Sequence, residues 1–482
     1  MQDSAITPSG GLLAGFAESL RQGDAVVELR HGLVGNDAVV EGPFGAKPLV
    51  YADYVASGRA VMQVERFILE RVLPYYANSH TEASYCGGLM TRLRRDARAT
   101  IEACCGATAE HAVIFVGSGA TAGINRLVKL FDVGPGDLVI IGPYEHHSNI
   151  LPWRESGAEL IELPEASAGG PDLDALHDVL DGVAPGRHVV CAFSAASNVT
   201  GITVDVAGVT RIAKAAGARV IWDYAGGGPY VPIAMQPAPD AAIDAIVVSP
   251  HKFLGGPGAS GVLIVRRDAI RTDRPSWPGG GTVKFVSPTS HDYSTSVEAR
   301  EEAGTPNVVG DIRAALAFLV KDAIGADRMA ARNDEMAARA FAAWSRVPQI
   351  ELLGSPTAHR LPIFSFRIRD GKGGYVHQQL VTRMLSDRFG IQARGGCACA
   401  GPYVHRLLDI GEDESEAIRQ AILAGEETTK PGFTRLNFSV LLSDEKVDFI
   451  LESVAELAAD AASFVGRYDC DRSRAIFFPR AA

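Results

Sequence analysis

Lys252 stands at a point in the sequence where a lysine can take part in chemistry. It lies in the segment 249–252 (Ser-Pro-His-Lys), which follows the apolar run 245–248 and precedes a glycine-rich turn at residues 255–258. A continuous apolar run predicts a buried parallel strand, and open α/β sheets bind ligands beyond the carboxyl ends of their strands. A lysine placed there can bond a carbonyl cofactor, although a surface lysine at a strand end is the commoner case.

Two polar turns follow other predicted strands. Residues 117–121 (Gly-Ser-Gly-Ala-Thr) begin a helix, where free N–H groups can hold a phosphate, although a simple helix cap also explains them. The turn 144–149 contains two adjacent histidines, of which one can stack on an aromatic cofactor or transfer protons. A polar capping turn is the alternative for this segment.

Asp223 and Asn198 also follow predicted strands. Asp223 ends the run 220–222, and a carboxylate buried at a strand end needs a partner. A protonated pyridine nitrogen is such a partner, and the carboxylate would keep that ring an electron sink. The amide of Asn198 can fix a substituent of the same ring.

Residues 394–402 (Arg-Gly-Gly-Cys-Ala-Cys-Ala-Gly-Pro) carry two cysteines in a glycine-flanked loop. Two cysteines separated by one residue can form half of a zinc site, but the sequence offers no matching second half. Two interpretations remain: the loop is mobile and carries a thiolate, or its two cysteines are inert. Arg435, on a later predicted strand, can pair bidentately with a carboxylate. Taken together, these residue types favour Lys252 as a lysine that bonds pyridoxal 5′-phosphate.

The elements that position these residues alternate between strand and helix from about residue 110 to 265, a pattern that predicts a mainly parallel sheet with helices on both faces. Helices are predicted at 121–131, 173–181, 206–216 and, as a link to a second domain, 309–324. Seven apolar runs are the expected strands, at 112–116, 138–142, 159–163, 188–193, 219–222, 245–248 and 261–265.

A smaller α+β domain is expected towards the C-terminus. Strands are predicted at 363–369 and 435–440 and helices at 376–389 and 444–462. The predicted division is an N-terminal arm, residues 1–50, on the smaller domain, a large cofactor-binding domain at 51–308 and the smaller domain at 309–482. A loop is expected from about 274 to 307.

Composition excludes several classes of function. The net charge is −11 and no basic run is present, so nucleic acid is an unexpected partner. No apolar stretch reaches the roughly 18 to 20 residues that span a bilayer, and residues 1–4 do not begin a signal peptide. The seven cysteines are odd in number and unevenly spread, which is typical of reduced thiols in a cytoplasmic protein.

The chain resembles the class V aminotransferases of fold type I, especially the cysteine desulfurase and selenocysteine lyase branch, over about 49–320 and 364–454. The segments 249–252 and 145–153 and the residues Asp223 and Asn198 carry this resemblance. It implies a homodimer with Lys252 as the Schiff-base lysine. The other implied cofactor-binding residues are His146 stacked on the ring, Asp223 at the pyridine nitrogen, Asn198 beside the ring, and Ala120, Thr121, Ser249 and His251 at the phosphate.

The same resemblance assigns substrate and partner residues. Arg394 and Arg435 match arginines that hold the substrate carboxylate, and His80 matches an active-site histidine. Asn198 is expected to contact the substrate as well as the cofactor. Cys399, five residues after Arg394, matches the cysteine that forms a persulfide. Thr305, in the segment 304–307, matches a residue that reaches the phosphate of the other subunit.

Three positions depart from the family pattern. Gly226 replaces a glutamine that bonds the phenolic oxygen of the cofactor, and Cys397 replaces a histidine. An additional segment, about 405–432, carries an acidic run at 412–416 and can reshape the entrance or a partner surface.

The predicted function is therefore a cytoplasmic pyridoxal-phosphate lyase that releases sulfur from L-cysteine, or selenium from selenocysteine, as a persulfide on Cys399 with L-alanine as product. Lys252, Cys399 and His146 are the predicted catalytic residues, no metal is expected, and a sulfur-acceptor protein is an expected partner. The alternatives are another class V enzyme acting on a small amino acid (a transaminase, another carbon–sulfur lyase or a decarboxylating carbon–carbon bond former) and a non-catalytic protein that kept the fold.

Overall fold

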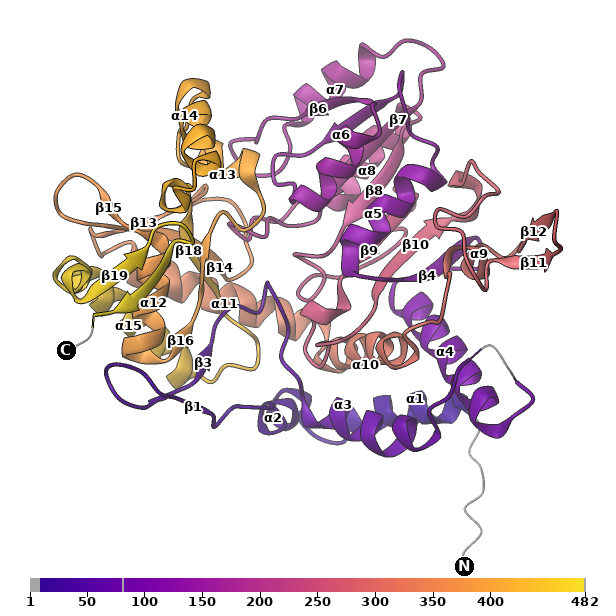
Figure 1. Ribbon diagram of the computed structural model, residues 1–482, viewed down its shortest axis with the longest axis horizontal. Coiled ribbons are helices and arrows are strands. Elements are labelled where there is room, and N and C mark those ends of the chain that lie inside the picture. Colours follow the sequence, from indigo (N-terminus) through magenta and orange to yellow (C-terminus); the bar gives the residue numbers. More distant parts are fainter. Residues whose placement is uncertain (1–8, 80–81, 481–482) are drawn as a thin grey trace, which may run out of the picture.

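A seven-stranded sheet forms the centre of the protein in the computed structural model, which describes residues 9–79 and 82–480 (Figure 1). The strand order is β4-β10-β9-β8-β7-β5-β6, and every neighbouring pair is parallel except those of β10, which runs antiparallel to β4 and β9. This confirms the mainly parallel sheet and all seven predicted strands. The strands are β4 (His111–Gly117), β5 (Leu138–Ile141), β6 (Glu159–Glu162), β7 (Val189–Ser194), β8 (Arg219–Asp223), β9 (Ala245–Val248) and β10 (Gly261–Arg266).

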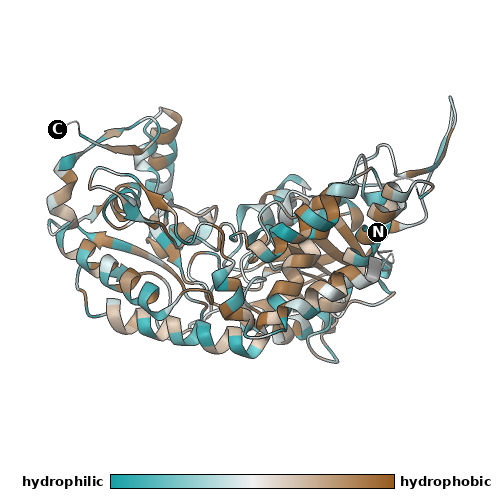
Figure 2. Ribbon diagram, turned by 90° about the horizontal axis from the view of Figure 1, so that it is seen from below, coloured by the Kyte–Doolittle hydropathy of each residue, from teal (hydrophilic) through white to brown (hydrophobic). Residues whose placement is uncertain are grey.

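Helices cover both faces of this sheet. On one face α5 (Gly119–Leu130) and α6 (Leu151–Glu155) bury Ile124 and Trp153 against alternate strand residues such as Ile141. The opposite face is covered by α4 (Tyr85–Cys104), α7 (Leu173–Asp181), α8 (Val206–Ala215) and α10 (Val308–Ile324). Because both faces are covered, β7 and β9 are buried at every position and are almost entirely apolar. The strands of the central sheet are mostly brown in Figure 2.

A second, antiparallel sheet has its own apolar core. Its order is β13-β14-β18-β17, with β15 also paired to β14. Trp344, Phe364 and Met384 are buried together in this core. The strands are β13 (Ile350–Leu352), β14 (Ile363–Arg369), β15 (Tyr375–Val376), β17 (Arg394–Gly396) and β18 (Phe433–Asn437), and the helices are α11 (Ala326–Trp344), α12 (Gln378–Phe389) and α15 (Asp444–Phe464).

The N-terminal segment is shared between the two cores, whereas the sequence predicts an arm on the smaller domain alone. Helices α1 (Ser9–Leu20) and α2 (Ala25–His31) bury Leu13, Phe16 and Leu29 in the core beside α4 and α10. Farther along, β3 (Val50–Tyr51) pairs in parallel with β16 (Ile391–Gln392) of the second unit. The short strands β1 (Val39–Val40) and β2 (Lys47–Pro48) pair with each other between these regions.

Other segments also differ from prediction. Helix α10 packs in the first core, and it is α11 that leads into the second. The predicted loop 274–307 contains the hairpin β11 (Val283–Val286)–β12 (His291–Tyr293) and helix α9 (Val297–Glu301). The C-terminal strands β19 (Tyr468–Asp471) and β20 (Ile476–Pro479) form a further hairpin.

The segment 405–432 is mostly helical. It contains the end of α13 (Gly401–Leu407) and α14 (Glu412–Leu423), which buries no residue and projects from the molecule (Figure 1). Helix α3 (Met62–Phe67) continues as a π-helical turn, Ile68–Val72. Among residues 9–79 and 82–480, no helix is both long and apolar enough to cross a membrane.

Candidate active site

A cavity of about 310 Å³ lies at the carboxyl edge of the central sheet and brings most of the predicted site residues together. Loops after five of the strands reach it, and so do β17, β18 and the cysteine loop of the second unit. The predicted residues that line it are Ala120, Thr121, His146, Asn198, Asp223, Ser249, His251, Lys252, Arg394, Cys399 and Arg435.

Lys252 reaches the cavity from a short 3₁₀ turn, Pro250–Lys252, directly after β9. Burial lowers the pKa of its amine to about 8, and the positive charges of Arg435 and Arg394 act in the same direction. The carboxylate of Asp223 opposes this shift. An appreciable fraction of the amine is therefore neutral near neutral pH, which is the form that attacks carbonyls and accepts protons.

Asp223 is the last residue of β8 and is 4% exposed. Its Oδ1 accepts a hydrogen bond of 2.7 Å from the N–H of Ala225, and burial raises the pKa of the carboxyl group. The neighbouring Lys252 partly offsets that increase. A carboxylate buried in this way is stabilised by a cation placed in the cavity.

Glu145 is a second buried carboxyl group near Asp223; it lies in the segment 145–153 that carries the family resemblance, but no role is predicted for it. It accepts hydrogen bonds from the N–H (2.8 Å) and hydroxyl (2.7 Å) of Ser194 and from the amide of Asn149 (2.5 Å). Burial nevertheless raises the pKa of Glu145 to about 7, and the charge of Asp223 adds to this increase. Because Ser194 and Asp223 are register partners in β7 and β8, Glu145 braces the strand ends that carry the site.

A tight turn at the start of α5 forms a cradle for an anion. Gly119 has φ +67°, and a Cβ atom at this position would lie 2.9 Å from both Ser249 Oγ and His251 Cε1. The N–H of Ala120 donates to Ser249 Oγ (3.0 Å), and the Thr121 and Ser148 hydroxyls are 2.7 Å apart. A helix N-terminus lined by hydroxyl groups favours a phosphate.

His146 lines the same cavity as a neutral imidazole. Its Nδ1 accepts a hydrogen bond from the N–H of Ser148 at 3.1 Å, and the Ser148 hydroxyl lies 3.0 Å from the same atom. Burial lowers the pKa of His146 to about 4, with smaller contributions from Lys252 and His147. A flat, uncharged ring is therefore presented to the cavity.

Two arginines face the cavity from neighbouring strands, β17 and β18. Arg435 is 2% exposed, and its Nη2 pairs with Asp53 Oδ1 at 2.9 Å while Nη1 donates to the carbonyl of Asn198 at 3.0 Å. Burial lowers the pKa of the Arg435 guanidinium. Its buried Nε–H has no partner in the part of the chain that the structure describes, so it can still donate to a ligand.

Cys399 is exposed and lines the cavity, whereas Cys397 lies apart and contacts the apolar cluster around Tyr403. The loop is closely held: the N–H of His147 donates to the Cys399 carbonyl at 2.8 Å, and the Asn198 amide donates to the Ala398 carbonyl at 2.9 Å. Both hydrogen bonds are accepted by carbonyl groups of the loop, one from a backbone N–H and one from a side-chain amide of the central-sheet unit.

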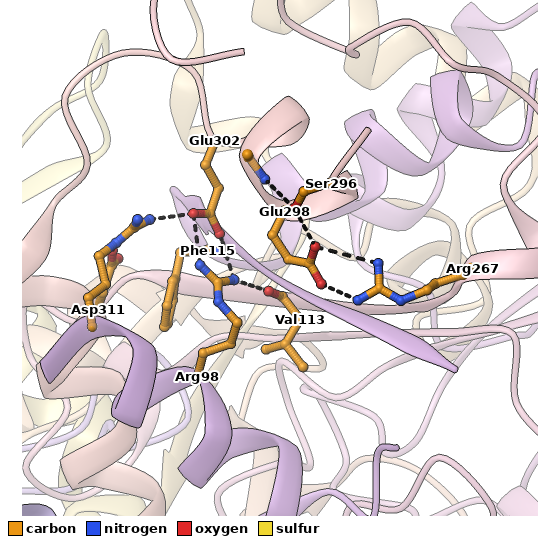
Figure 3. A network of polar contacts seen from close by, with 10 residues as sticks. Arg98, Val113, Phe115, Arg267, Ser296, Glu298, Glu302 and Asp311 are labelled. Atoms are coloured by element: carbon orange, nitrogen blue, oxygen red, sulfur yellow. Dashed lines mark hydrogen bonds and ion pairs between the residues drawn. The ribbon is translucent and has the colours of Figure 1, made fainter. Parts of the chain in front are cut away.

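Thr305 does not line the cavity, and the prediction for His80 falls outside the described residues. Thr305 is exposed, in the segment between α9 and α10. A polar network anchors the start of the Thr305 segment: Glu302 pairs with Arg98 at 2.9 Å and accepts from the N–H of Phe115 at 2.8 Å (Figure 3). This segment is thus attached to β4, which leads into the anion cradle.

The sequence alone gave no role to Asp53 or His147. Asp53 belongs to a stretch of polar and small residues, 51–58, that packs closely against the lysine turn. The close packing is seen at Gly58, where a Cβ atom would lie 1.8 Å from the carbonyl oxygen of Phe253. His147 is adjacent to the predicted His146. In both cases the partner is far away in the chain, so local patterns could not reveal the contact.

These residues fit pyridoxal 5′-phosphate. The cavity holds an amine for its aldehyde, a buried acid for its ring nitrogen, a flat imidazole and a phosphate cradle at separate positions. The buried Oδ1 of Asn198 also lacks a partner among the described residues and can accept a hydrogen bond from a ring substituent.

Comparisons with known proteins show the family to which the chain belongs. The model of the family "Aminotransferase class-V" matches residues 50–440. A cysteine desulfurase of Klebsiella pneumoniae subsp. pneumoniae is 32% identical, over 75% of this chain and 86% of that protein. A probable cysteine desulfurase 1 of Mycobacterium leprae is 27% identical, over 77% of this chain and 59% of that protein.

Solved structures show the same fold. The cysteine desulfurase CsdA of Escherichia coli matches with a TM-score of 0.72 and 22% identity, over 90% of this chain and 98% of that chain. The apo cysteine desulfurase of Thermococcus onnurineus NA1 matches with a TM-score of 0.70 and 23% identity, over 85% and 95%. The predicted α/β fold class is confirmed.

Proposed function

The chain belongs to the class V aminotransferases, a family that depends on pyridoxal 5′-phosphate, and we propose that it is a cysteine desulfurase. The observation that carries this proposal is that Lys252 and Cys399, from separate units of the fold, line one cavity. An enzyme that only transfers amino groups needs the lysine but has no use for a thiol there. The products would be L-alanine and a persulfide on Cys399.

We propose that Lys252 bonds the cofactor and that Asp223 pairs with its ring nitrogen. His146 stacks on the ring, Asn198 bonds a ring substituent, and the cradle of Ala120, Thr121, Ser249 and His251 holds the phosphate. The bound cofactor supplies an electron sink for a carbanion at the substrate α-carbon. The low pKa of Lys252 equips its amine to remove and return the α-proton.

Arg435 and Arg394 hold the substrate carboxylate in this proposal. The Nε–H of Arg435 is free for it, while Asp53 and the Asn198 carbonyl fix the guanidinium plane. His80 is proposed to contact the substrate as well. The exposed Arg394 adds a second charge at the cavity rim.

Cys399 is proposed as the nucleophile. Its thiolate forms a bond to the substrate sulfur as the carbon–sulfur bond breaks, and the electron pair of the broken bond stays with carbon. Protonation of that carbon then gives alanine, and the sulfur remains on Cys399 until an acceptor protein or a reductant removes it. Cys397 does not line the cavity, which favours Cys399 as the reactive thiol.

We further propose a cytoplasmic homodimer in which Thr305 reaches the phosphate of the other subunit. Thr305 is exposed and stands apart from the cavity of its own chain. Large apolar side chains also lie exposed in the segments 62–79 and 82–85, which suits a subunit contact. These side chains are Met62, Leu69, Leu73, Tyr75, Tyr76 and Tyr85.

The proposed function is tested with purified protein and L-cysteine. The visible absorbance of lysine-bound cofactor should be present and should disappear in Lys252→Ala. Alanine and, with a reductant, sulfide should form in equal amounts, and Cys399→Ser should lose this activity while keeping the absorbance. Full desulfurase activity of Cys399→Ser would show that the cysteine role is wrong.

Gly226 favours a second candidate within the family. It lines the cavity without a side chain, so residue 226 cannot supply the contact to the cofactor's phenolic oxygen that the resemblance implies. This difference favours another class V reaction: a transaminase, another carbon–sulfur lyase or a decarboxylating carbon–carbon bond former. Incubating the holoenzyme with a panel of amino acids and identifying the products separates these reactions from desulfuration. If cysteine is the only substrate and alanine the product, these alternatives are disfavoured.

A further inference from the structure

His147 contacts the cysteine loop at two residues, Cys399 and Gly401. The backbone N–H of His147 donates to the carbonyl of Cys399 at 2.8 Å. Two residues farther along, the N–H of Gly401 donates to the ring Nε2 of the same histidine at 3.0 Å. One residue of the central-sheet unit thus holds two positions, 399 and 401, of a loop that belongs to the other unit.

The loop needs such support because its backbone is unfavourable by itself. Ala398 and Cys399 have φ values of +51° and +57°, the left-handed region, which residues with a Cβ atom rarely occupy. Cys399 is exposed, so burial of its side chain contributes little to this conformation. The loop has one hydrogen bond of its own, from the N–H of Ala400 to the Cys397 carbonyl at 3.1 Å, and Ala400 is buried in the apolar cluster around Tyr403. The hydrogen bonds that reach the two left-handed residues and Gly401 from the other unit come from His147 and Asn198.

The turn that carries His147 is well suited to this task. Asn149 joins it to buried groups, since its amide donates to Glu145 and its Oδ1 accepts from Trp153 Nε1 at 3.0 Å. The preceding residue, His146, lines the cavity with Lys252. His146 therefore lines the cofactor cavity, and the adjacent His147 contacts the cysteine loop.

The ring contact also fixes the tautomer of His147. Nε2 must accept the Gly401 N–H, so the ring proton resides on Nδ1. A side chain that replaces this histidine can keep the contact only if it offers an acceptor at a similar distance from the backbone. Glutamine has such an acceptor in its Oε1, whereas alanine has none.

We propose that His147 is a positioning residue that holds Cys399 in the active-site cavity by docking the loop 398–401. This role rests on the proposed desulfurase function, since only a reaction that uses the Cys399 thiol depends on the loop. Removing the ring releases Gly401 and lets the left-handed residues relax, so the thiol loses its alignment with the substrate sulfur. Steps that need Lys252 but not Cys399 continue.

The test compares His147→Ala and His147→Gln with wild-type holoenzyme and with His188→Ala, a change at another half-buried histidine on the central sheet. Three quantities are measured: amide hydrogen exchange in the peptide containing 398–404, single-turnover persulfide formation on Cys399 by mass spectrometry, and α-proton exchange of L-alanine. In His147→Ala we expect faster amide exchange and persulfide formation slowed by about 100-fold, since a small displacement of a reacting group has effects of that size.

The α-proton exchange of alanine should stay within about twofold of wild type in that variant, because the Lys252 region is unchanged. His147→Gln should recover much of the persulfide rate, and His188→Ala should match wild type in all three measurements. Unchanged amide exchange and persulfide formation in His147→Ala would overturn the proposal, and so would an equal loss of α-proton exchange. Wild-type protein that forms no alanine from cysteine would instead refute the proposed function, while amide exchange would still decide whether His147 docks the loop.

Discussion

Arg394 and Arg435 are direct cross-strand partners in the antiparallel pair β17–β18, and both line the active-site cavity. Like charges in this arrangement repel each other, and each lowers the cost of bringing an anion between them. Asp53 pairs with Arg435 alone, at 2.9 Å. The pair therefore carries an excess of positive charge into a cavity that also contains Lys252, which suits the carboxylate of an amino-acid substrate.

Arg435→Lys should raise KM for cysteine by about 10- to 100-fold, the cost of one or two charge-assisted hydrogen bonds, with a smaller effect on kcat. Lysine keeps the charge but lacks the planar fork that contacts Asn198 and Asp53 while leaving Nε–H free. Steady-state kinetics over a wide cysteine range measures the change. Arg367→Lys, on β14 and paired with Glu351 away from the cavity, is the matched control and should leave KM unchanged. A loss confined to kcat would contradict the carboxylate role.

Cofactor incorporation should report the lowered pKa of Lys252. The amine is protonated below its pKa of about 8 and neutral above it, and only the neutral form attacks an aldehyde. The rate at which cofactor-free protein binds added pyridoxal 5′-phosphate covalently should therefore rise up to about pH 8 and then level off. Nα-acetyl-lysine is the reference, whose rate keeps rising towards the ordinary lysine pKa of about 10.4. A protein rate that still climbs steeply above pH 9 would show that Lys252 titrates normally.

Asp223→Asn should slow catalysis while leaving the cofactor bound. The neutral amide cannot hold a proton on the ring nitrogen, so α-proton removal should fall by at least about 100-fold. Lys252 is untouched, and the visible absorbance of bound cofactor should remain. Deuterium exchange at the α-carbon of alanine gives the rate, and thermal melting shows whether the variant is folded. Wild-type exchange in the variant would assign the acid role to another group, of which Glu145 is the nearest buried candidate.

The central sheet could be predicted because β7 and β9 are covered on both faces and so leave continuous apolar runs in the sequence. Helix α14 is not predicted, because it buries no residue and its apolar stripe is confined to Ile418, Ala421 and Ile422 beside an acidic run. The grouping of Lys252, Asp223 and Cys399 followed from strand ends and the family resemblance. The pairing of Arg394 with Arg435 and the contact of His147 with Gly401 depend on register and on folding between distant segments, which local sequence does not encode.

Gly119→Ala should weaken cofactor binding, in addition to the loss of stability that an alanine with a left-handed backbone causes. A Cβ at this residue would lie 2.9 Å from Ser249 Oγ and His251 Cε1, two groups proposed to hold the phosphate. Gly106 is the matched control, since its φ of +59° is close to the +67° of Gly119 but a Cβ there meets nothing within 4 Å.

Both variants should lose about 1 kcal/mol of unfolding free energy through the left-handed backbone. Only Gly119→Ala should also raise the Kd for pyridoxal 5′-phosphate, by about tenfold or more, because its methyl group displaces the phosphate ligands by several tenths of an ångström. Titration of cofactor-free protein followed by absorbance measures Kd, and denaturant unfolding measures stability. Equal cofactor affinity in the two variants would show that the phosphate is held elsewhere, whereas a selective loss in Gly119→Ala places it at the start of α5.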